Sequence, residues 1–391
     1  MTFSCTESSC PQFTFDIFGQ KLIYAHRFGT LLRLQRAQPA CHSGWMLYSL
    51  LRPLIFRFDA ESAHRLSIGA LGLMPSLPCF TDKVLASRVA GLDFPNPVGL
   101  APGYDKNAEI AAPAFGLGFG SVELGTVTPL PQAGNPKPRL FRLVEDRAVI
   151  NRMGFNNDGM EKVAERLSKL DLSKLPGRIG INIGANKDSV DRIADYVAAI
   201  QRLGLLADYV TVNISSPNTP GLRALQDKAA LDDLLGKVVA AAPEGRPVFL
   251  KVAPDLEPAD VADICQSVLE HRVAALIVSN TTITRPPLKS HHREESGGLS
   301  GAPLRDLAHQ RLIDFRRASG GKIPLIGVGG IANADDAYAR IRAGASLVQL
   351  YSALVYEGPS LADTINRGLA RRLKRDGFSS VTDAVGVDVP L

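Results

Sequence analysis

The sequence predicts an α/β protein, a (β/α)8 TIM barrel with an N-terminal helical extension. Two observations predict this fold: short apolar segments alternate with amphipathic helical segments from about residue 96 onward, and eight such apolar segments occur. The predicted strands are 97–101, 121–126, 178–184, 209–215, 248–253, 274–280, 324–329 and 347–352. They are continuously apolar rather than alternating, as expected of parallel strands that are covered on both faces.

Amphipathic helical segments follow most of these strands. They are 159–170, 189–203, 228–242, 258–272, 304–318, 334–343 and 359–375, and the last of them closes the ring. A doubly wound sheet is the alternative fold, but the G-x-G-x-x-G turn expected after its first strand is absent. Two long connections, 129–157 and 281–302, are rich in Pro, Gly and charge, which is typical of lids and binding loops.

The N-terminal part divides into two segments ahead of a barrel domain that we place at 78–391. Residues 46–77 contain two stretches with apolar residues at helical spacing. Two interpretations are open for them: a helical pair packed on the barrel, or a pair that docks on a membrane. Residues 1–45 have no consistent period, and we expect a variable segment that is either disordered or precedes a true start at Met46.

Composition excludes several classes of protein. A net charge of +5 over 391 residues is too small to predict nucleic-acid binding, which needs a clustered basic face. Five scattered cysteines support neither a disulfide framework nor a zinc site and favour a reducing compartment. No early apolar stretch is long enough to span a bilayer. We therefore expect neither a metal nor a nucleic-acid partner.

Polar residues recur at the ends of the predicted strands. Asn182, Asn213 and Lys251 interrupt apolar strands, and Ser279 and Asn280 end another. A single asparagine is more often a turn residue, but a set at one end of a barrel is typical of a site. The set lacks paired carboxylates and metal-ligand spacing, which argues against glycosidase and metal-assisted chemistry. Amides that both donate and accept suit a planar, imide-like ligand.

Glycines near the end of the barrel indicate a phosphate site. The segment 325–331 reads Leu-Ile-Gly-Val-Gly-Gly-Ile, and the eighth predicted strand ends at Ser352. Many TIM barrels bind phosphate here through backbone N–H groups and a helix N-terminus. Plain turn glycines are the alternative interpretation.

Five motifs in order carry a family resemblance. They are Gly-Leu-Ala-Pro-Gly-Tyr-Asp-Lys at 99–106, Asn-Arg-Met-Gly-Phe-Asn-Asn at 151–157, Asn-Ile-Ser-Ser-Pro-Asn-Thr-Pro-Gly at 213–221, Gly-Gly-Leu-Ser-Gly at 297–301, and the segment 325–331. From about Asp59 to Asp383 the chain resembles the quinone-linked, class 2 dihydroorotate dehydrogenases. The resemblance implies oxidation of (S)-dihydroorotate to orotate in pyrimidine biosynthesis, with hydride passing to FMN and electrons then to a membrane quinone.

The resemblance also implies a set of site residues. One FMN per chain would be held by Pro102, Gly103, Thr126, Asn182, Asn213, Lys251, Ser279, Gly301, Gly330, Tyr351 and Ser352. Dihydroorotate would be held by Lys106, Asn151, Arg152, Met153, Gly154, Phe155, Asn213, Asn218, Asn280 and Thr281. Ser216 matches the catalytic base of class 2 enzymes, where class 1 enzymes place a cysteine, and Thr219 would relay the proton.

The quinone would reach the flavin through a tunnel formed with the N-terminal helices. The resemblance places His64, Arg142 and Tyr351 in this tunnel, although a helix-packing role is an equal alternative for His64. Peripheral attachment to the cytoplasmic face of a bacterial inner membrane is the expected location.

Rival functions stay open at this level. One is another FMN barrel, such as a class 1 enzyme that uses fumarate or a nicotinamide-linked partner. A second is a non-redox barrel that binds a sugar phosphate, as an isomerase or lyase. A third is a degenerate barrel that only binds a ligand. Bound FMN would separate the first from the other two, because it is yellow.

Overall fold

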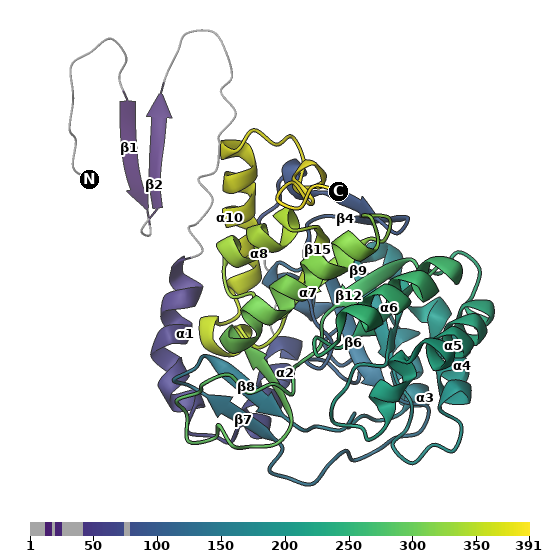
Figure 1. Cartoon of the computed structure of the whole chain (residues 1–391). Coiled ribbons are helices and arrows are strands. Elements are labelled where there is room, and N and C mark those ends of the chain that lie inside the picture. Colours follow the sequence, from purple (N-terminus) through teal and green to yellow (C-terminus); the bar gives the residue numbers. More distant parts are fainter. Residues whose placement is uncertain (1–11, 18–19, 26–41, 74–78) are drawn as a thin grey trace. The chain divides into compact units, whose positions relative to one another are not determined.

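The computed structural model describes the backbone of residues 12–17, 20–25, 42–73 and 79–391, and side chains from residue 48 onward within these ranges. The chain divides into two compact units, Met1–Ala40 and Cys41–Leu391. In the first unit, β1 (Gln12–Ile17) pairs antiparallel with β2 (Gln20–Ala25) (Figure 1). The lack of a consistent period in 1–45 gave no indication of this hairpin; residues 1–11, 18–19 and 26–41 lie outside the described residues, and the expectation of a variable segment stays a prediction.

Eight parallel strands close into a barrel, and each lies where the sequence predicted a strand. They are β5 (Val98–Leu100), β6 (Ser121–Val127), β9 (Arg178–Ile183), β10 (Tyr209–Asn213), β11 (Val248–Val252), β12 (Ala275–Val278), β14 (Leu325–Val328) and β15 (Ala345–Leu350). Neighbours along the chain are neighbours in the barrel, and β15 pairs with β5 to close it. The predicted TIM barrel is confirmed.

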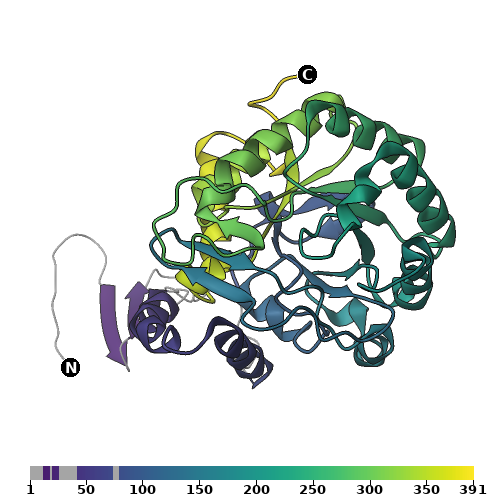
Figure 2. The ribbon, with the colours of Figure 1, turned by 60° about the horizontal axis from the view of Figure 1, so that its bottom comes forward.

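Helices surround the barrel as an outer ring (Figure 2). They are α3 (Met160–Leu167), α4 (Arg192–Leu203), α5 (Lys228–Ala241), α6 (Pro258–Glu270), α7 (Arg305–Ala318), α8 (Ala334–Arg342), the short α9 (Leu354–Glu357) and α10 (Leu361–Arg375). All seven predicted helices are present and differ only at their ends. The helix α4 begins three residues later than predicted because the Asp191 side chain accepts a hydrogen bond from the Ala194 N–H at 3.0 Å and caps it there.

Short elements complete the fold. Single 3-10 turns are η1 (Lys83–Leu85), η2 (Pro113–Leu117), η3 (Leu172–Lys174), η4 (Gly204–Leu206), η5 (Leu222–Gln226), η6 (Ala302–Leu304) and η7 (Thr382–Ala384). A hairpin of β3 (Ser87–Val89) and β4 (Leu92–Phe94) precedes the first barrel strand. Its Phe94 packs in one cluster with Tyr209 and Phe249, whose rings stack at 4.5 Å. This cluster fills the N-terminal end of the barrel, so that the opposite end is the one open to a ligand.

The two long connections, predicted only as loops, pair with each other. The strands β7 (Leu140–Leu143) and β8 (Ala148–Asn151) form a hairpin in the first connection, and β13 (Gly298–Gly301) in the second pairs with β8. Their side chains form a separate apolar cluster of Phe141, Leu143, Ala148, Ile150 and Leu299. Strands of four residues leave little local signal in a sequence, and β8 pairs with β13 across about 150 positions.

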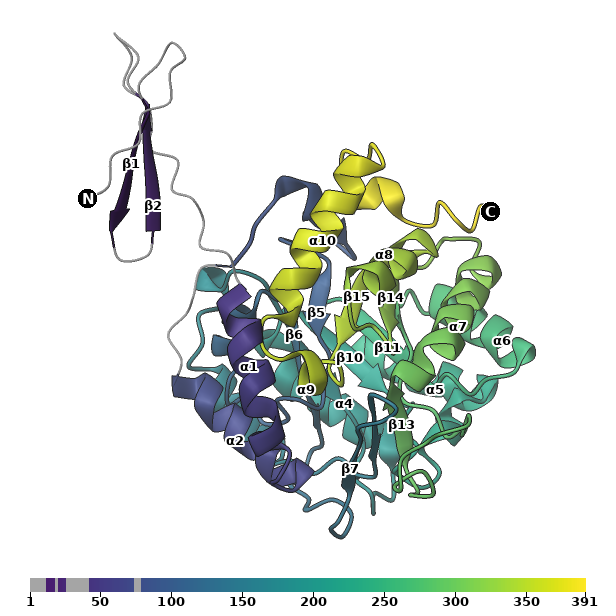
Figure 3. The ribbon, with the colours of Figure 1, turned by 90° about the vertical axis from the view of Figure 1, so that its left-hand side faces the viewer.

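The predicted helical pair is α1 (His42–Ile55) and α2 (Ala60–Leu73), and it packs against this small sheet and the end of the barrel (Figure 3). From α1, Tyr48 and Arg52 donate hydrogen bonds to the backbone oxygens of Val355 and Tyr356 at 2.7 and 2.8 Å. From α2, Glu61 accepts two hydrogen bonds from the Arg139 guanidinium at 2.7 and 3.0 Å. Among the described residues, no helix is long and apolar enough to cross a membrane.

Candidate active site

A cavity of about 560 Å³ opens at the C-terminal end of the barrel and continues between α1 and α2. Three of the residues predicted for the site do not line it: Arg152, Asn182 and Thr219. The other predicted residues line the cavity, with His64 and Arg142 in its helical part. At the barrel end these residues are Pro102, Gly103, Lys106, Thr126, Asn151, Met153, Gly154, Phe155, Asn213, Ser216, Asn218, Lys251, Ser279, Asn280, Thr281, Gly301, Gly330, Tyr351 and Ser352. One cavity therefore joins the predicted cofactor, substrate and quinone sites.

Amides and hydroxyls form a layer across the barrel mouth. Asn182 Oδ1 accepts hydrogen bonds from Thr126 Oγ1 at 2.6 Å and from Asn213 Nδ2 at 3.0 Å. Asn182 is fully buried, so it supports the cavity wall from behind. Below it, Asn182 Nδ2 donates to Glu123 at 2.8 Å. The layer is satisfied internally, as buried polar groups must be.

Lys251 carries the positive charge of this layer. Its side chain lies on β11 at the cavity wall and is 4% exposed. It makes no hydrogen bond or ion pair with any residue that the structure describes, and burial lowers its pKa while the charge of Glu123 raises it. A buried ammonium facing a cavity is ready to bind an electron-rich ligand.

Glycines line the cavity next to α8 and the small sheet. Gly301, Gly329 and Gly330 have φ of 93°, 109° and 72°, in the left-handed region that favours glycine. A Cβ on Gly330 would meet the Arg305 backbone at 2.4 Å, so the turn admits no side chain. Ser352 and Ser300 share a hydrogen bond of 2.7 Å at the same place. The backbone here is close enough to the cavity to bind an anion.

The fully buried Arg340 supports this glycine turn from α8. Its guanidinium donates to the backbone oxygens of Gly329 at 2.8 Å and Arg305 at 2.6 Å. Burial lowers the pKa of Arg340 to about 10, which leaves it charged near neutrality. The turn is therefore held from behind by a permanent positive charge.

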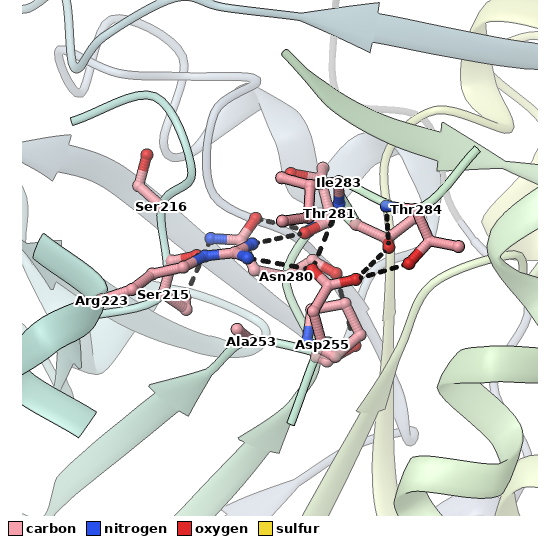
Figure 4. A network of polar contacts seen from close by, with 12 residues as sticks. Ser215, Ser216, Arg223, Ala253, Asp255, Asn280, Thr281, Ile283 and Thr284 are labelled. Carbon is pink, nitrogen blue, oxygen red and sulfur yellow. Dashed lines mark hydrogen bonds and ion pairs between the residues drawn. The ribbon is translucent and has the colours of Figure 1, made fainter. Parts of the chain in front are cut away.

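Ser216 lies in the loop after β10 with its hydroxyl away from the neighbouring ion pair (Figure 4). It is nearly buried, and its Oγ accepts a hydrogen bond from the Asn218 N–H at 3.2 Å. The Asn218 amide donates in turn to Asn151 Oδ1 at 3.2 Å. The serine loop is thereby connected to the Asn151 motif across the cavity.

An ion pair between Arg223 and Asp255 holds the serine loop to the connection 281–302 (Figure 4). Arg223 donates to Asp255 at 2.9 Å and to the backbone oxygens of Ser215 and Thr281, both at 3.1 Å. Asp255 also accepts hydrogen bonds from the three residues after Thr281. The donors are the hydroxyls of Thr282 and Thr284 and the N–H of Ile283. The charge pair thus connects five groups of the serine loop and of the connection 281–302.

Two predicted residues, Arg152 and Thr219, lie outside the cavity lining. The Arg152 guanidinium pairs with Glu295 at 2.7 Å and lies over the Phe141 ring at 4.6 Å, so its side chain holds the second connection rather than facing the cavity. Thr219 is buried within the serine loop, and its backbone oxygen accepts a hydrogen bond from the Leu222 N–H at 3.2 Å. The roles expected of both residues remain predictions.

Lys106 faces the cavity from the loop after β5. Burial lowers its pKa to about 8, and the nearby carboxylate of Glu61 opposes this shift. It therefore changes charge close to physiological pH, unlike an exposed lysine. A carboxylate ligand would bind to its protonated form.

Three aromatic rings surround the passage between the barrel and the helices. The His64 ring packs edge-on against Tyr104 at 5.2 Å, and its Nδ1 lies 3.4 Å from the Tyr351 hydroxyl. Burial, with the charges of Lys106 and Arg65, lowers the pKa of His64 to about 3. The imidazole is therefore neutral near pH 7, and the passage is lined by uncharged rings at this point.

Arg142 closes the other side of the passage from β7. It donates to the backbone oxygens of Phe56, at 3.3 Å, and Phe58, and its guanidinium lies 4.6 Å from the Phe56 ring centroid. These carbonyls follow the C-terminal end of α1, where a cation is favourable. Arg142 therefore anchors α1 to the small sheet as well as lining the cavity.

Sequence reasoning missed Glu123, Arg223, Asp255 and Arg340. Glu123 could have been found, because a glutamate between valine and leucine in an apolar strand is as unusual as Lys251. Arg223 and Asp255 follow strand ends, as site residues of a barrel do, but charged loop residues are common. Nothing in the helical pattern of α8 distinguishes Arg340 from its exposed neighbours.

The fold and the polar cavity at the C-terminal mouth define an enzyme of the TIM-barrel class. No group of His, Cys, Asp or Glu within the described part of the chain could hold a metal ion. The chain belongs to the dihydroorotate dehydrogenase family, whose model, described as "Dihydroorotate dehydrogenase", matches residues 84–373.

Relatives and solved structures agree with this assignment. The chain is 64% identical over 344 residues to the dihydroorotate dehydrogenase (quinone) of Novosphingobium aromaticivorans, covering 87% of this chain and 99% of the relative. It is 62% identical over 342 residues to that of Sphingopyxis alaskensis, covering 87% and 96%. The crystal structure of DHODH in complex with ferulenol from Eimeria tenella superposes with a TM-score of 0.81 at 39% identity, covering 84% of this chain and 96% of that one. The predicted resemblance is confirmed.

Replacing Arg223 with methionine should loosen the connection 281–302. The change leaves the partly buried Asp255 without its cation, so we expect the free energy of unfolding to fall by about 2–3 kcal/mol in urea denaturation. Trypsin should also cleave faster after Lys289 in the native protein. Arg293→Met, which removes a surface pair with Glu294, is the control and should cost less than about 0.5 kcal/mol. Equal effects of the two substitutions would contradict a special role for Arg223.

Proposed function

We propose that the chain catalyses the reaction of its family, the oxidation of dihydroorotate to orotate in pyrimidine biosynthesis, with FMN as cofactor and a membrane quinone as final acceptor. The observation that carries this proposal is the continuous cavity, which runs from the amide layer and Lys251 to an apolar passage between α1 and α2. A two-substrate redox enzyme needs this arrangement, with a polar pocket on one side of the cofactor and an apolar route to the other.

The residues at the barrel mouth fit FMN. Its phosphate would bind beside Ser352 and to the backbone at Gly301 and Gly330, where the neighbouring backbone of Arg147 and Arg305 leaves no room for a side chain. The ring would lie against the amide layer, where Lys251 Nζ has no partner among the described residues and Gln349 Oε1 is buried without one. When bound, FMN supplies the acceptor for the hydride that leaves C6 of dihydroorotate.

Dihydroorotate offers an imide and a carboxylate, and the cavity has a partner for each. The amides of Asn151, Asn218 and Asn280 line one wall and can both donate to and accept from the imide. Lys106 is the cation for the carboxylate. These groups orient the substrate so that C5 faces the serine loop.

Ser216 takes the proton from C5 as the base of the reaction. A hydroxyl is a weak base, so its own proton needs a route away. We assign that route to Thr219, which is three residues further along the same loop. The Asn218 N–H donates to Ser216 Oγ and would stabilise the developing negative charge there.

The helical pair is proposed as the quinone entrance and the contact with the membrane. The two helices and their connection expose six large apolar side chains, Leu50, Leu51, Leu54, Phe58, Leu66 and Leu73, the last at 89%. Large exposed apolar patches mark interaction surfaces, and amphipathic helices of this kind lie in the headgroup region. We place the enzyme on the cytoplasmic face of a bacterial inner membrane.

The proposed function is tested by measuring its two half-reactions separately, the reduction of the flavin by dihydroorotate and its reoxidation by quinone. Dihydroorotate added anaerobically to the purified protein should bleach the flavin absorbance, and a short-chain quinone should restore it, whereas fumarate or NAD should not. In Ser216→Ala we expect unchanged flavin content and a bleaching rate lower by about 10²–10⁴-fold, because the base is missing. The rate at which quinone restores the flavin absorbance should be unchanged in this variant, and it serves as the internal control. A yellow protein that dihydroorotate does not bleach would refute the substrate, and a colourless protein that does not bind FMN would refute the function.

A larger side chain in the passage should slow only the quinone half. Ala63 lines the cavity on α2, and Ala63→Phe should lower kcat/KM for quinone by about tenfold through overpacking. Bleaching by dihydroorotate should be unaffected. Ser62→Phe adds the same volume on the exposed outer face and is the matched control. If both variants use quinone equally well, the passage is not the entrance.

Orotate binding should weaken as Lys106 loses its proton. Because the folded pKa of Lys106 is lowered to about 8, the ammonium is present below that pH and disappears above it. The Kd of orotate, measured by its effect on the flavin spectrum, should be constant below about pH 7 and rise about tenfold per pH unit above pH 8. Lys106→Met should bind weakly at every pH. A wild-type Kd that does not change between pH 7 and 9 would remove Lys106 from carboxylate recognition.

A further inference from the structure

The carboxylate of Glu123 lies inside the barrel beneath the amide layer and has no part in the reaction proposed above. Its residue is 1% exposed, and it accepts hydrogen bonds from Gln349 at 2.6 Å, Asn182 at 2.8 Å and the Tyr209 hydroxyl at 3.3 Å. All three donors are neutral, and no lysine or arginine of the described residues forms an ion pair with it. A buried carboxylate paired only in this way costs stability.

The carboxylate determines the direction of the hydrogen bonds above it. An ionised carboxylate can only accept, so Asn182 must turn its Nδ2 toward Glu123. The Asn182 oxygen then faces the cavity side, where it accepts from Thr126 Oγ1 at 2.6 Å and Asn213 Nδ2 at 3.0 Å. A neutral amide in place of Glu123 could donate as well as accept and would leave this orientation open.

The same direction continues to the serine loop. With its Nδ2 donating to Asn182 and Thr126, Asn213 turns its Oδ1 toward Ser215, accepting from the N–H at 3.2 Å and the hydroxyl at 2.8 Å. Ser215 Oγ accepts from Asn280 Nδ2 at 2.9 Å. A single acceptor at the bottom therefore orients every amide up to the residue before Ser216.

Glu123 is also the counter-charge of Lys251. Burial lowers the pKa of Lys251, and within the described part of the chain the charge of Glu123 is what raises it. The side chains that neighbour Lys251 on the adjoining strands, Asn213 on β10 and Ile277 on β12, are neutral. Without Glu123, nothing charged on these elements would compensate the burial of the ammonium.

We infer that Glu123 is a positioning residue that keeps Lys251 charged and orients the amide layer, and that it thereby sets the reduction potential of the bound flavin. This rests on the proposed placement of FMN over Lys251. A positive charge beside the ring favours the electron-rich reduced state, so the protonation of Lys251 influences the potential directly.

The test is the reduction potential of FMN in the holoenzyme, measured with redox dyes between about pH 6 and pH 9. Wild type should show one continuous slope, because Lys251 stays protonated throughout. In Glu123→Gln, loss of the counter-charge should lower the pKa of Lys251 further, so the gap between the variant and wild type should change with pH. We expect a change of about tenfold in the reduction equilibrium constant, which is about 30 mV for a two-electron couple. Glu123→Asp keeps the charge and should restore the wild-type slope.

Two control variants distinguish the possible failures. Tyr209→Phe removes a neutral donor to Glu123 without changing charge and should keep the wild-type slope. Lys251→Met should lower the potential at every pH, and a wild-type potential in this variant would refute the FMN placement itself. If the potentials of wild type and Glu123→Gln change with pH in parallel while the potential of Lys251→Met is lowered, only the role of Glu123 is overturned. If Glu123→Gln does not fold, the slope of the wild-type potential against pH still tests the inference. A break in that slope that is absent from Lys251→Met would mean that Lys251 titrates in the wild type, and it would overturn the inference.

Discussion

Closure of eight parallel strands is the constraint on which the rest of this structure depends. Because every strand runs in the same direction, all carboxyl ends meet at one rim, and residues separated by more than 200 positions become neighbours there. Gln349 and Glu123 share a hydrogen bond of 2.6 Å across 226 positions. The N-terminal end is filled by the cluster around Phe94, Tyr209 and Phe249, so polar groups can be concentrated only at the opposite mouth.

The mouth is completed by elements outside the barrel. The small sheet of β7, β8 and β13 extends from the rim and supports the helical pair through Arg139 and Arg142. This arrangement gives the cavity two different environments, an amide layer with buried charges at the barrel end and neutral aromatic rings at the helical end. A polar substrate and an apolar acceptor would thus approach the same cofactor from separate sides without competing for one pocket.

Much of the fold and most of the site could be predicted. All eight barrel strands and seven helices follow from hydrophobic periodicity, because burial on both faces leaves a signal within each segment. Most residues expected at the site do line one cavity, since strand ends must meet at the rim. The small sheet was missed because β8 and β13 pair across two loops. The direction of the Arg152 side chain could not be predicted either, because a motif identifies a residue without its rotamer.

The sequence by itself determined the barrel, the family and the kinds of residue at each strand end, because these depend on local pattern and on residue identity. The tertiary structure alone decided which charges face one another. The charge of Glu123 acts on Lys251, and Arg223 connects three loops through Asp255, only because closure of the barrel brings distant segments together. Such contacts depend on register and side-chain direction across the whole barrel, and no segment of the chain carries that information alone.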